Sequence, residues 1–217
     1  RTIIPRKGNL LHRLYLTIDL QCKNNGVTSY TVNNFINSLI KNASIKIGGR
    51  TIDEYQSQYK QLKSELLTTT ENKYNESDAT YGGKSALYEF DGQVGNQIGD
   101  THERLKGNIP IVVGSNTLVT KRFTYIFDFW FTRNIGQSLP LDALSNHDIE
   151  LIFNVDTKDN VIGDTVNIDS DTFKLSNMLL YGDYIFIDGE EKRRFEQSTH
   201  EYLIEQVQYA GSLRTSE

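Results

Sequence analysis

The sequence predicts an all-β sandwich or barrel of roughly eight or nine short strands separated by turns, with short helices inserted between strands. Two observations support this class. The 217 residues include 19 Thr, 12 Tyr and 10 Phe but only five Ala, a composition that favours pleated, half-buried strands over helices. Hydrophobic residues make up 37% of the chain and alternate with polar ones in several segments, which predicts one large domain with a substantial core.

The first third of the chain predicts one strand, two helices and a hairpin. Residues 13–20 alternate between apolar and polar side chains, which is typical of a strand with one buried face. Apolar residues in the range 32–40 repeat at helical spacing and predict a short helix. Residues 43–53 predict a hairpin that turns at Gly48-Gly49, and residues 55–67 predict a second helix.

The remainder predicts a long polar excursion followed by strands. Residues 68–108 are polar and rich in Gly, so we expect a long surface loop with at most short strands. Residues 123–131 place aromatic side chains on one face and Trp130 on the other, which predicts a central strand covered on both sides. Residues 200–208 also have a strand pattern. The other predicted strands are 109–113, 149–155, 161–168, 173–180 and 184–187.

Charge and cysteine content exclude several functions. The 23 basic and 28 acidic residues give a net charge of −5, which argues against direct binding to nucleic acid or to an anionic membrane surface. No apolar run approaches the roughly 20 residues that span a bilayer, so we expect no membrane insertion, and the first residues do not resemble a signal peptide. The single cysteine, Cys22, excludes an internal disulfide framework and suits a reducing compartment.

No motif predicts a cofactor or a metal site. The sequence YGGKS at residues 81–85 resembles the end of a phosphate-binding loop, but Asp78 stands where that loop requires a glycine. A group of aspartates lacks the spacing of a calcium-binding loop and is better explained by solvated turns. These residues are Asp156, Asp159, Asp164, Asp169 and Asp171.

No catalytic residue is predicted either. The histidines are far apart in sequence and are better explained by structural hydrogen bonding than by catalysis; they are His12, His102, His147 and His200. Cys22 lacks the surroundings of a nucleophile, and no Gly-x-Ser-x-Gly sequence is present. Asn42 and Asn75 open glycosylation sequences but lack a secretory signal. We therefore expect a protein that is not an enzyme, although a glycosidase pair among the many carboxylates is not excluded by counting.

Four blocks of the sequence closely resemble the major capsid proteins of large icosahedral nucleocytoplasmic DNA viruses. They cover more than a third of the chain in the order that this family has. The third block is the most specific because it combines Phe-Trp-Phe, Arg-Asn, Leu-Pro-Leu and His-Asp. The blocks are IPRKGNLLHRLYL at 4–16, VNNFINSLIKNASIKIGGRTID at 32–53, FDFWFTRNIGQSLPLDALSNHDIEL at 127–151 and EEKRRFEQSTHEYLIEQVQ at 190–208.

The resemblance implies a fold. Such proteins contain two consecutive eight-stranded jelly rolls, and this chain would supply the first half of that double jelly roll. Residues 1–188 would form the N-terminal jelly roll, with a truncated first strand, and residues 189–217 the connector and the start of the second roll. The polar excursion, residues 70–107, matches no block and would be an external variable loop, on which glycans are the expected partners.

The resemblance also implies a function. The chain would be a structural subunit of the virion capsid, assembled in the host cytoplasm. Three copies would form a pseudo-hexagonal capsomer, whose partners are neighbouring capsomers and minor capsid proteins. The alternative is a jelly-roll carbohydrate-binding module, similar to a lectin, which rests on the sandwich architecture and the exposed excursion alone.

Overall fold

The computed structural model describes residues 1–23, 29–30, 35–67, 110–111, 118–161, 174–198 and 201–211. Its strands are β1 (Thr2–Ile3), β2 (Leu10–Lys23), β3 (Ser29–Tyr30), β4 (Ile40–Ile47), β5 (Arg50–Gln56), β6 (Pro110–Ile111), β7 (Leu118–Ile126), β8 (Leu139–Pro140), β9 (Ile149–Val155) and β10 (Lys174–Ile185). Its helices are α1 (Phe35–Leu39), α2 (Ser57–Leu67), α6 (Trp130–Arg133), the 3₁₀ helix η2 (Ile135–Gln137), α7 (Lys158–Val161) and α8 (Gly189–Gln197).

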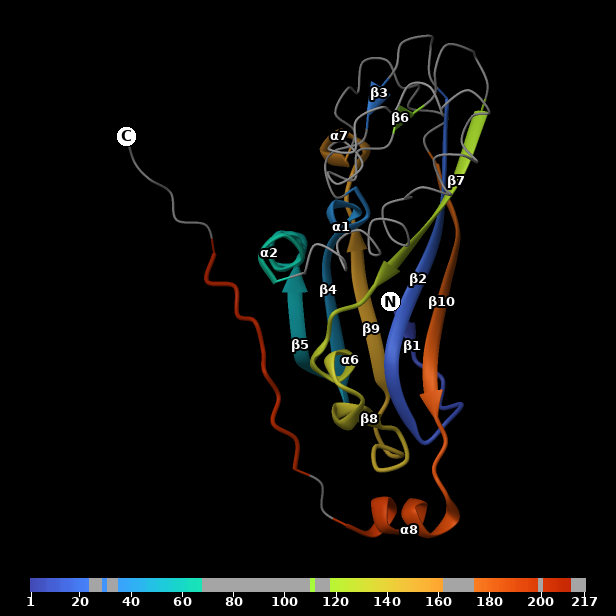
Figure 1. Ribbon diagram of the computed structural model, residues 1–217, viewed down its shortest axis with the longest axis vertical. Coiled ribbons are helices and arrows are strands. Elements are labelled where there is room, and N and C mark those ends of the chain that lie inside the picture. The colour runs from blue at the N-terminus through green and yellow to red at the C-terminus, as the bar shows by residue number, and fades with distance from the viewer. Residues whose placement is uncertain are drawn as a thin grey trace.

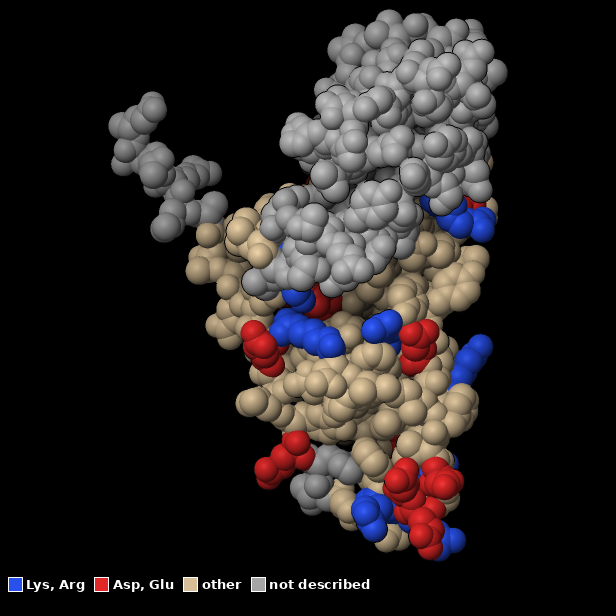
Figure 2. Space-filling view, viewed as in Figure 1, with Lys and Arg blue, Asp and Glu red and all other residues tan. Residues whose placement is uncertain are grey.

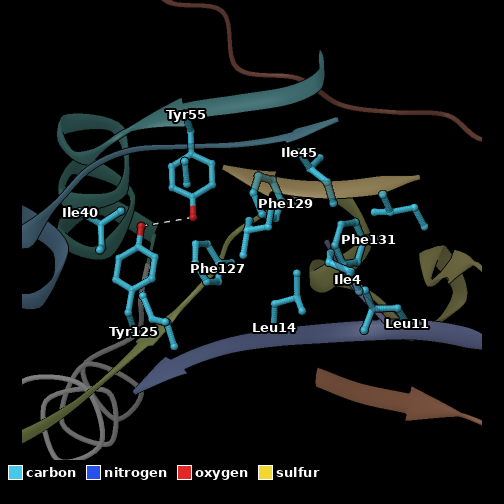
Figure 3. Close-up of a cluster of buried hydrophobic side chains, with 14 of the residues drawn as sticks. Ile4, Leu11, Leu14, Ile40, Ile45, Tyr55, Tyr125, Phe127, Phe129 and Phe131 are labelled. Atoms are coloured by element: carbon cyan, nitrogen blue, oxygen red, sulfur yellow. Dashed lines mark hydrogen bonds between the residues drawn. The ribbon is translucent and has the colours of Figure 1, made fainter. Parts of the chain in front are cut away.

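Two antiparallel sheets form the two layers of the fold (Figure 1). One has the strand order β1-β9-β4-β5, and the other has the order β10-β2-β7 with β8 also paired to β2. Strands β3 and β6 form a separate short pair. The buried side chains of both sheets meet between them (Figure 3). The all-β sandwich with short helical insertions that the sequence predicted is therefore confirmed.

Strand β2 is the centre of its sheet because it pairs with β10 on one side and with β7 on the other. Its alternate residues Leu14, Leu16, Ile18 and Leu20 are buried, as the period-two pattern over 13–20 predicted. The strand continues beyond that range at both ends. The alternation skips from Leu11 to Leu14, close to the irregularity in its pairing with β10.

Strand β10 replaces the two strands predicted at 173–180 and 184–187. Gly182, which falls between the two predicted strands, lies inside β10 opposite Leu14. A Cβ atom at residue 182 would lie 3.1 Å from Leu11 Cδ1 and 3.2 Å from Tyr184 Cε2. Close packing, and not a turn, therefore accounts for this glycine.

The predicted hairpin is confirmed, and the helices on either side of it meet it at other residues than expected. Strands β4 and β5 pair antiparallel across Gly48 and Gly49, whose φ angles of 56° and 82° lie in the left-handed region that favours glycine. Tyr55 belongs to β5 and not to the following helix, which begins at Ser57. Ile40 belongs to β4, so the helix expected over 32–40 ends at Leu39.

The strand predicted over 123–131 is wrong beyond Ile126. The chain leaves the sheet there, forms α6 and η2, and rejoins β2 at Leu139. Phe127, Phe129 and Phe131 keep the alternation because they pack on one another between the sheets, with ring centroids 5.9 and 5.8 Å apart. This aromatic packing fills the core and produces the same sequence pattern as a strand. Trp130, placed by prediction in mid-strand, is the first residue of α6.

Several predictions fall wholly or partly outside the described residues. The excursion over 68–108 lies outside them, as do YGGKS at 81–85 and Asn75. Of the strand predicted at 109–113, the described Pro110–Ile111 form β6. Of the strand predicted at 161–168, the one described residue, Val161, ends α7 and so is helical. The strand pattern over 200–208 is wrong for its described part, because residues 201–208 contain no strand. Among the described residues, no helix is long and apolar enough to cross a bilayer.

Asp19 joins the three strands of the second sheet. Its carboxylate accepts hydrogen bonds from Arg122 Nε on β7 at 2.7 Å and from Asn177 Nδ2 on β10 at 2.8 Å. The side chain is 6% exposed although it points away from the main core. These bonds, led by that from Arg122, hold the pKa of Asp19 below its ordinary value of 3.8.

Asp19→Asn is expected to lower the free energy of unfolding by about 1 kcal/mol at pH 7, because the acceptor loses its charge and keeps only one oxygen for its two donors. Since the folded-state pKa of Asp19 is lowered, its contribution is present above the ordinary pKa and is lost as the pH falls through the folded-state pKa. Urea unfolding of both proteins checks this. The difference between them should shrink between pH 5 and pH 2.5; a constant difference would contradict the role given to Asp19.

Candidate interaction site

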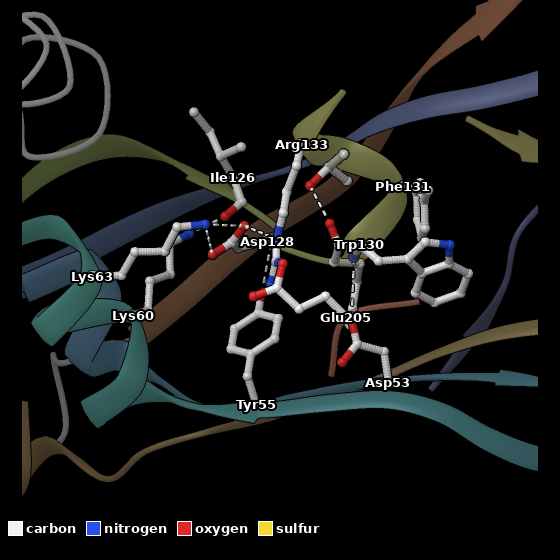
Figure 4. A network of polar contacts seen from close by, with 12 residues as sticks. Asp53, Tyr55, Lys60, Lys63, Ile126, Asp128, Trp130, Phe131, Arg133 and Glu205 are labelled. Atoms are coloured by element: carbon white, nitrogen blue, oxygen red, sulfur yellow. Dashed lines mark hydrogen bonds and ion pairs between the residues drawn. The ribbon is translucent and has the colours of Figure 1, made fainter. Parts of the chain in front are cut away.

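A cluster of charged side chains lies where α2, β5 and α6 meet (Figure 4). Asp128, two residues before α6, accepts hydrogen bonds from Lys63 Nζ of α2 at 2.7 and 2.6 Å. Arg133 Nε at the end of α6 lies 3.7 Å from Asp128 Oδ1. The side chains of Asp128, Arg133 and Lys63 are 15%, 22% and 29% exposed, so water screens their attraction less than at the surface.

Two buried tyrosines tie β5 to the end of β7 below this cluster (Figure 3). Tyr125 donates its hydroxyl proton to Tyr55 Oη at 3.2 Å, and Tyr55 Oη also accepts the backbone N–H of Asp128 at 3.1 Å. Burial raises the pKa of Tyr55 well above its ordinary value. Lys60 of α2 donates to the carbonyl of Ile126 and lies 3.7 Å from the ring centroid of Tyr125. These contacts fix the position of Asp128.

Asp53 of β5 holds the start of α6. Its Oδ2 accepts the backbone N–H of Trp130 at 3.2 Å. Burial raises the pKa of Asp53, and the hydrogen bond from Trp130 opposes that shift only in part. The carboxylate thus serves as an acceptor for an otherwise unpaired helix N–H.

Residues 201–211, called here the C-terminal segment, run alongside β5 in an extended conformation after α8 (Figure 1). Tyr202, Ile204 and Val207 are half-buried, whereas Leu203 between them is 89% exposed. Arg133 Nη1 forms an ion pair with Glu205 Oε2 at 3.0 Å. The segment therefore contacts the charged cluster directly.

Two cavities lie beneath the C-terminal segment. One of about 530 Å³ separates β5 residues 51–56 from residues 206–209. The other, of about 650 Å³, has Trp130, Leu144 and Ile204 in its lining. The segment is therefore loosely packed on the sandwich, in contrast to the core between the sheets.

The edge strand β10 exposes apolar side chains on the other side of the molecule. Met178, Leu179 and Tyr181 are 41%, 49% and 52% exposed, and Phe186 just beyond the strand is 73% exposed. Charged side chains of both signs are interspersed on the face of the molecule that Figure 2 shows. A group of exposed apolar side chains on a sheet edge is typical of a protein–protein contact.

His12 and Cys22 both belong to β2, and His147 lies in the turn before β9. His12 Nδ1 lies 3.3 Å from the carbonyl of Phe131, and His147 is exposed after the β8 turn. His102 and His200 lie outside the described residues, and Cys22 lies in β2 opposite Val119. Within the described ranges, no group of three or more His, Cys, Asp or Glu could hold a metal ion.

Asp156, one of the aspartates considered for calcium, forms hydrogen bonds within a turn. Asp156 Oδ1 accepts the N–H of Thr157 and the Nδ2 group of Asn160, both at 2.8 Å, at the start of α7. These bonds satisfy donors of a short helix turn, as expected for a solvated turn. Asp164, Asp169 and Asp171 lie outside the described residues.

Sequence reasoning missed the cluster around Asp128. Its members come from residues 53–63, 128–133 and 205, and no local pattern joins them. One signal was available: Asp128 and Arg133 are charged residues within the most aromatic segment of the chain, where an unpaired charge would be costly.

Comparison with known proteins identifies a family. The model described as the major capsid protein N-terminus matches residues 1–188. A major capsid protein of Pyramimonas orientalis virus is 31% identical over 210 residues, which cover 96% of this chain and 45% of that protein. A major capsid protein of Paramecium bursaria Chlorella virus 1 is 29% identical over 213 residues, which cover 97% and 41%. The chain thus spans less than half the length of these relatives.

Two solved structures are similar to almost the whole of this chain and to less than half of their own chains. VP54 of PBCV-1, a crystal structure fitted into a reconstruction of the virophage Sputnik, has a TM-score of 0.69 and 26% identity. The similarity covers 95% of this chain and 42% of that one. The quasi-atomic model of the PBCV-1 capsid has a TM-score of 0.63, also with 26% identity. The sandwich described above accordingly has the fold of the matched part of VP54.

Proposed function

Since this chain belongs to the family of the major capsid protein N-terminus, we propose that it is part of a structural subunit of the icosahedral shell of a large DNA virus. The match of the family model to residues 1–188 is the observation that carries this proposal. The fold and the four sequence blocks support it. A structural subunit acts by assembling into the shell, so we propose no catalytic role and no cofactor for this chain.

We propose that the chain divides at residue 188. Residues 1–188 form the first jelly roll, and the family match ends at the same residue. Residues 189–217 are the connector and the start of a second jelly roll. The loose packing of the C-terminal segment supports this division, because a segment that belongs to a neighbouring unit does not need to fill the core of the first one.

We propose that three copies form a pseudo-hexagonal capsomer, with neighbouring capsomers and minor capsid proteins as further partners. The exposed apolar side chains of β10 support a contact between subunits. Assembly in the host cytoplasm and glycans on residues 70–107 belong to the same proposal. Direct contact with the genome is not part of it, because the net charge of −5 disfavours phosphate binding.

Size-exclusion chromatography with light scattering of the full-length protein tests the assembly. The proposal predicts a stable mass three times that of one chain. A monomer that binds glycans would instead favour the carbohydrate-binding alternative. A monomer without glycan binding would contradict both.

Leu179→Lys is expected to weaken the trimer about tenfold without changing the melting temperature, because it places a charge in the proposed apolar contact on β10. Light scattering over a dilution series measures this dissociation. Leu62→Lys is the matched control, since Leu62 of α2 is 59% exposed and lies on another element. Equal dissociation of both variants, or of neither, would show that β10 is not the contact.

A further inference from the structure

The contacts that hold the C-terminal segment come from a few side chains. Among the described residues, Tyr202 Oη donates to the carbonyl of Ser138 at 3.4 Å, and Gln206 Nε2 donates to the carbonyl of Ile52. The ion pair between Arg133 and Glu205 is the charged contact of this set. Ile204 also packs against the core, but cavities of about 530 and 650 Å³ beneath the segment leave much of this apolar contact open.

Arg133 has the carboxylate of Asp128 on one side and Glu205 of the C-terminal segment on the other (Figure 4). Its Nε is buried, lies 3.7 Å from Asp128 Oδ1 and has no hydrogen-bond partner within the described part of the chain. Asp128 is itself held by Lys63 at 2.6 Å. The planar guanidinium presents its other edge, at Nη1, to Glu205, and this geometry suits an arginine that joins two carboxylates.

We propose that Arg133 is a positioning residue that fixes the C-terminal segment along β5 and thereby sets the direction in which the chain leaves the first jelly roll. The inference deepens the proposed function, because it rests on residues 189–217 being the connector to a second unit. The rigid part is the sandwich, where Asp128, Lys63 and the Tyr55–Tyr125 pair hold α6 in place. The movable part is the segment carrying Glu205, which is 84% exposed.

A double-mutant cycle in the full-length protein tests the pair. The variants are Arg133→Gln, Glu205→Gln and the double variant, and the readout is the rate of chymotrypsin cleavage within residues 201–211. Cleavage follows the population in which the segment is detached. Glu205→Gln is expected to raise the rate about fivefold at low salt, the effect of losing a pair worth about 1 kcal/mol. The double variant should be cleaved no faster than Arg133→Gln alone.

Glu201→Gln is the matched control, since Glu201 is an exposed carboxylate on the same segment, and its cleavage rate should equal that of the unmodified protein. Raising the salt to about 0.5 M should speed cleavage of the unmodified protein and leave Glu205→Gln nearly unchanged. Unchanged cleavage in Glu205→Gln, strictly additive effects, or full resistance in all variants would each overturn the proposal.

The same samples separate this inference from the proposed function. Light scattering reports the mass of every variant. A trimer without coupling between Arg133 and Glu205 would count against the positioning role alone. A monomer with intact coupling would count against the capsomer and leave the positioning role standing.

Discussion

Trp130→Ala is expected to lower the free energy of unfolding by about 4 kcal/mol, a large part of the 5–15 kcal/mol that stabilises a typical domain. The side chain is 2% exposed and packs edge-on against Phe131 with ring centroids 5.1 Å apart. Its removal leaves a cavity beneath β5 and loosens α6, whose first N–H is held by Asp53. This loss of stability depends on the burial of the Trp130 side chain and not on the strand conformation that the sequence predicted for it.

Circular dichroism during urea unfolding measures this effect, because Trp130 is the only tryptophan and fluorescence could not follow the variant. Ile135→Ala is the control. Ile135 is five residues away and 65% exposed, so its truncation should change the free energy by less than about 0.5 kcal/mol. Equal midpoints for Trp130→Ala and the unmodified protein would show that the region around α6 is not part of the core.

Asp128→Ala is expected to cost about 3 kcal/mol, because it leaves Lys63 and Arg133 without the carboxylate on which both converge. Asp128→Asn should cost less, since the amide oxygen still accepts one hydrogen bond from Lys63. Asp148→Ala removes an exposed carboxylate and serves as the control. Urea unfolding at pH 7 ranks the three variants. A loss in Asp128→Ala no larger than in the control would contradict the role of the cluster.

Strands with one buried face could be predicted from the sequence, because their alternation is local. Residues 149–155 form β9 with the predicted bounds, and the hairpin at Gly48-Gly49 follows from residues that tolerate positive φ. The residues at which helices begin could not be predicted in the same way. Tyr55 fits the helical repeat of α2, yet its burial against Tyr125 and Phe129 holds it in β5.

The segment after Ile126 shows why alternation alone is insufficient. Phe127, Phe129 and Phe131 are fully buried, as in a strand, but the hydrogen bond from Trp130 N–H to Asp53 draws the chain across to the other sheet. That partner is 77 residues away in sequence. The charged cluster has the same character, because Lys63, Asp128 and Glu205 come from three distant parts of the chain. Long-range pairings of this kind leave no local pattern in a single sequence.

Quantitative mass spectrometry of purified virus particles tests the central claim most directly. The account predicts that peptides of this chain rank among the most abundant in intact particles. They should also remain with the shell fraction when the genome and internal proteins are released. Peptides that are absent from particles, or that leave with the genome, would contradict the assignment of this chain to the capsid shell.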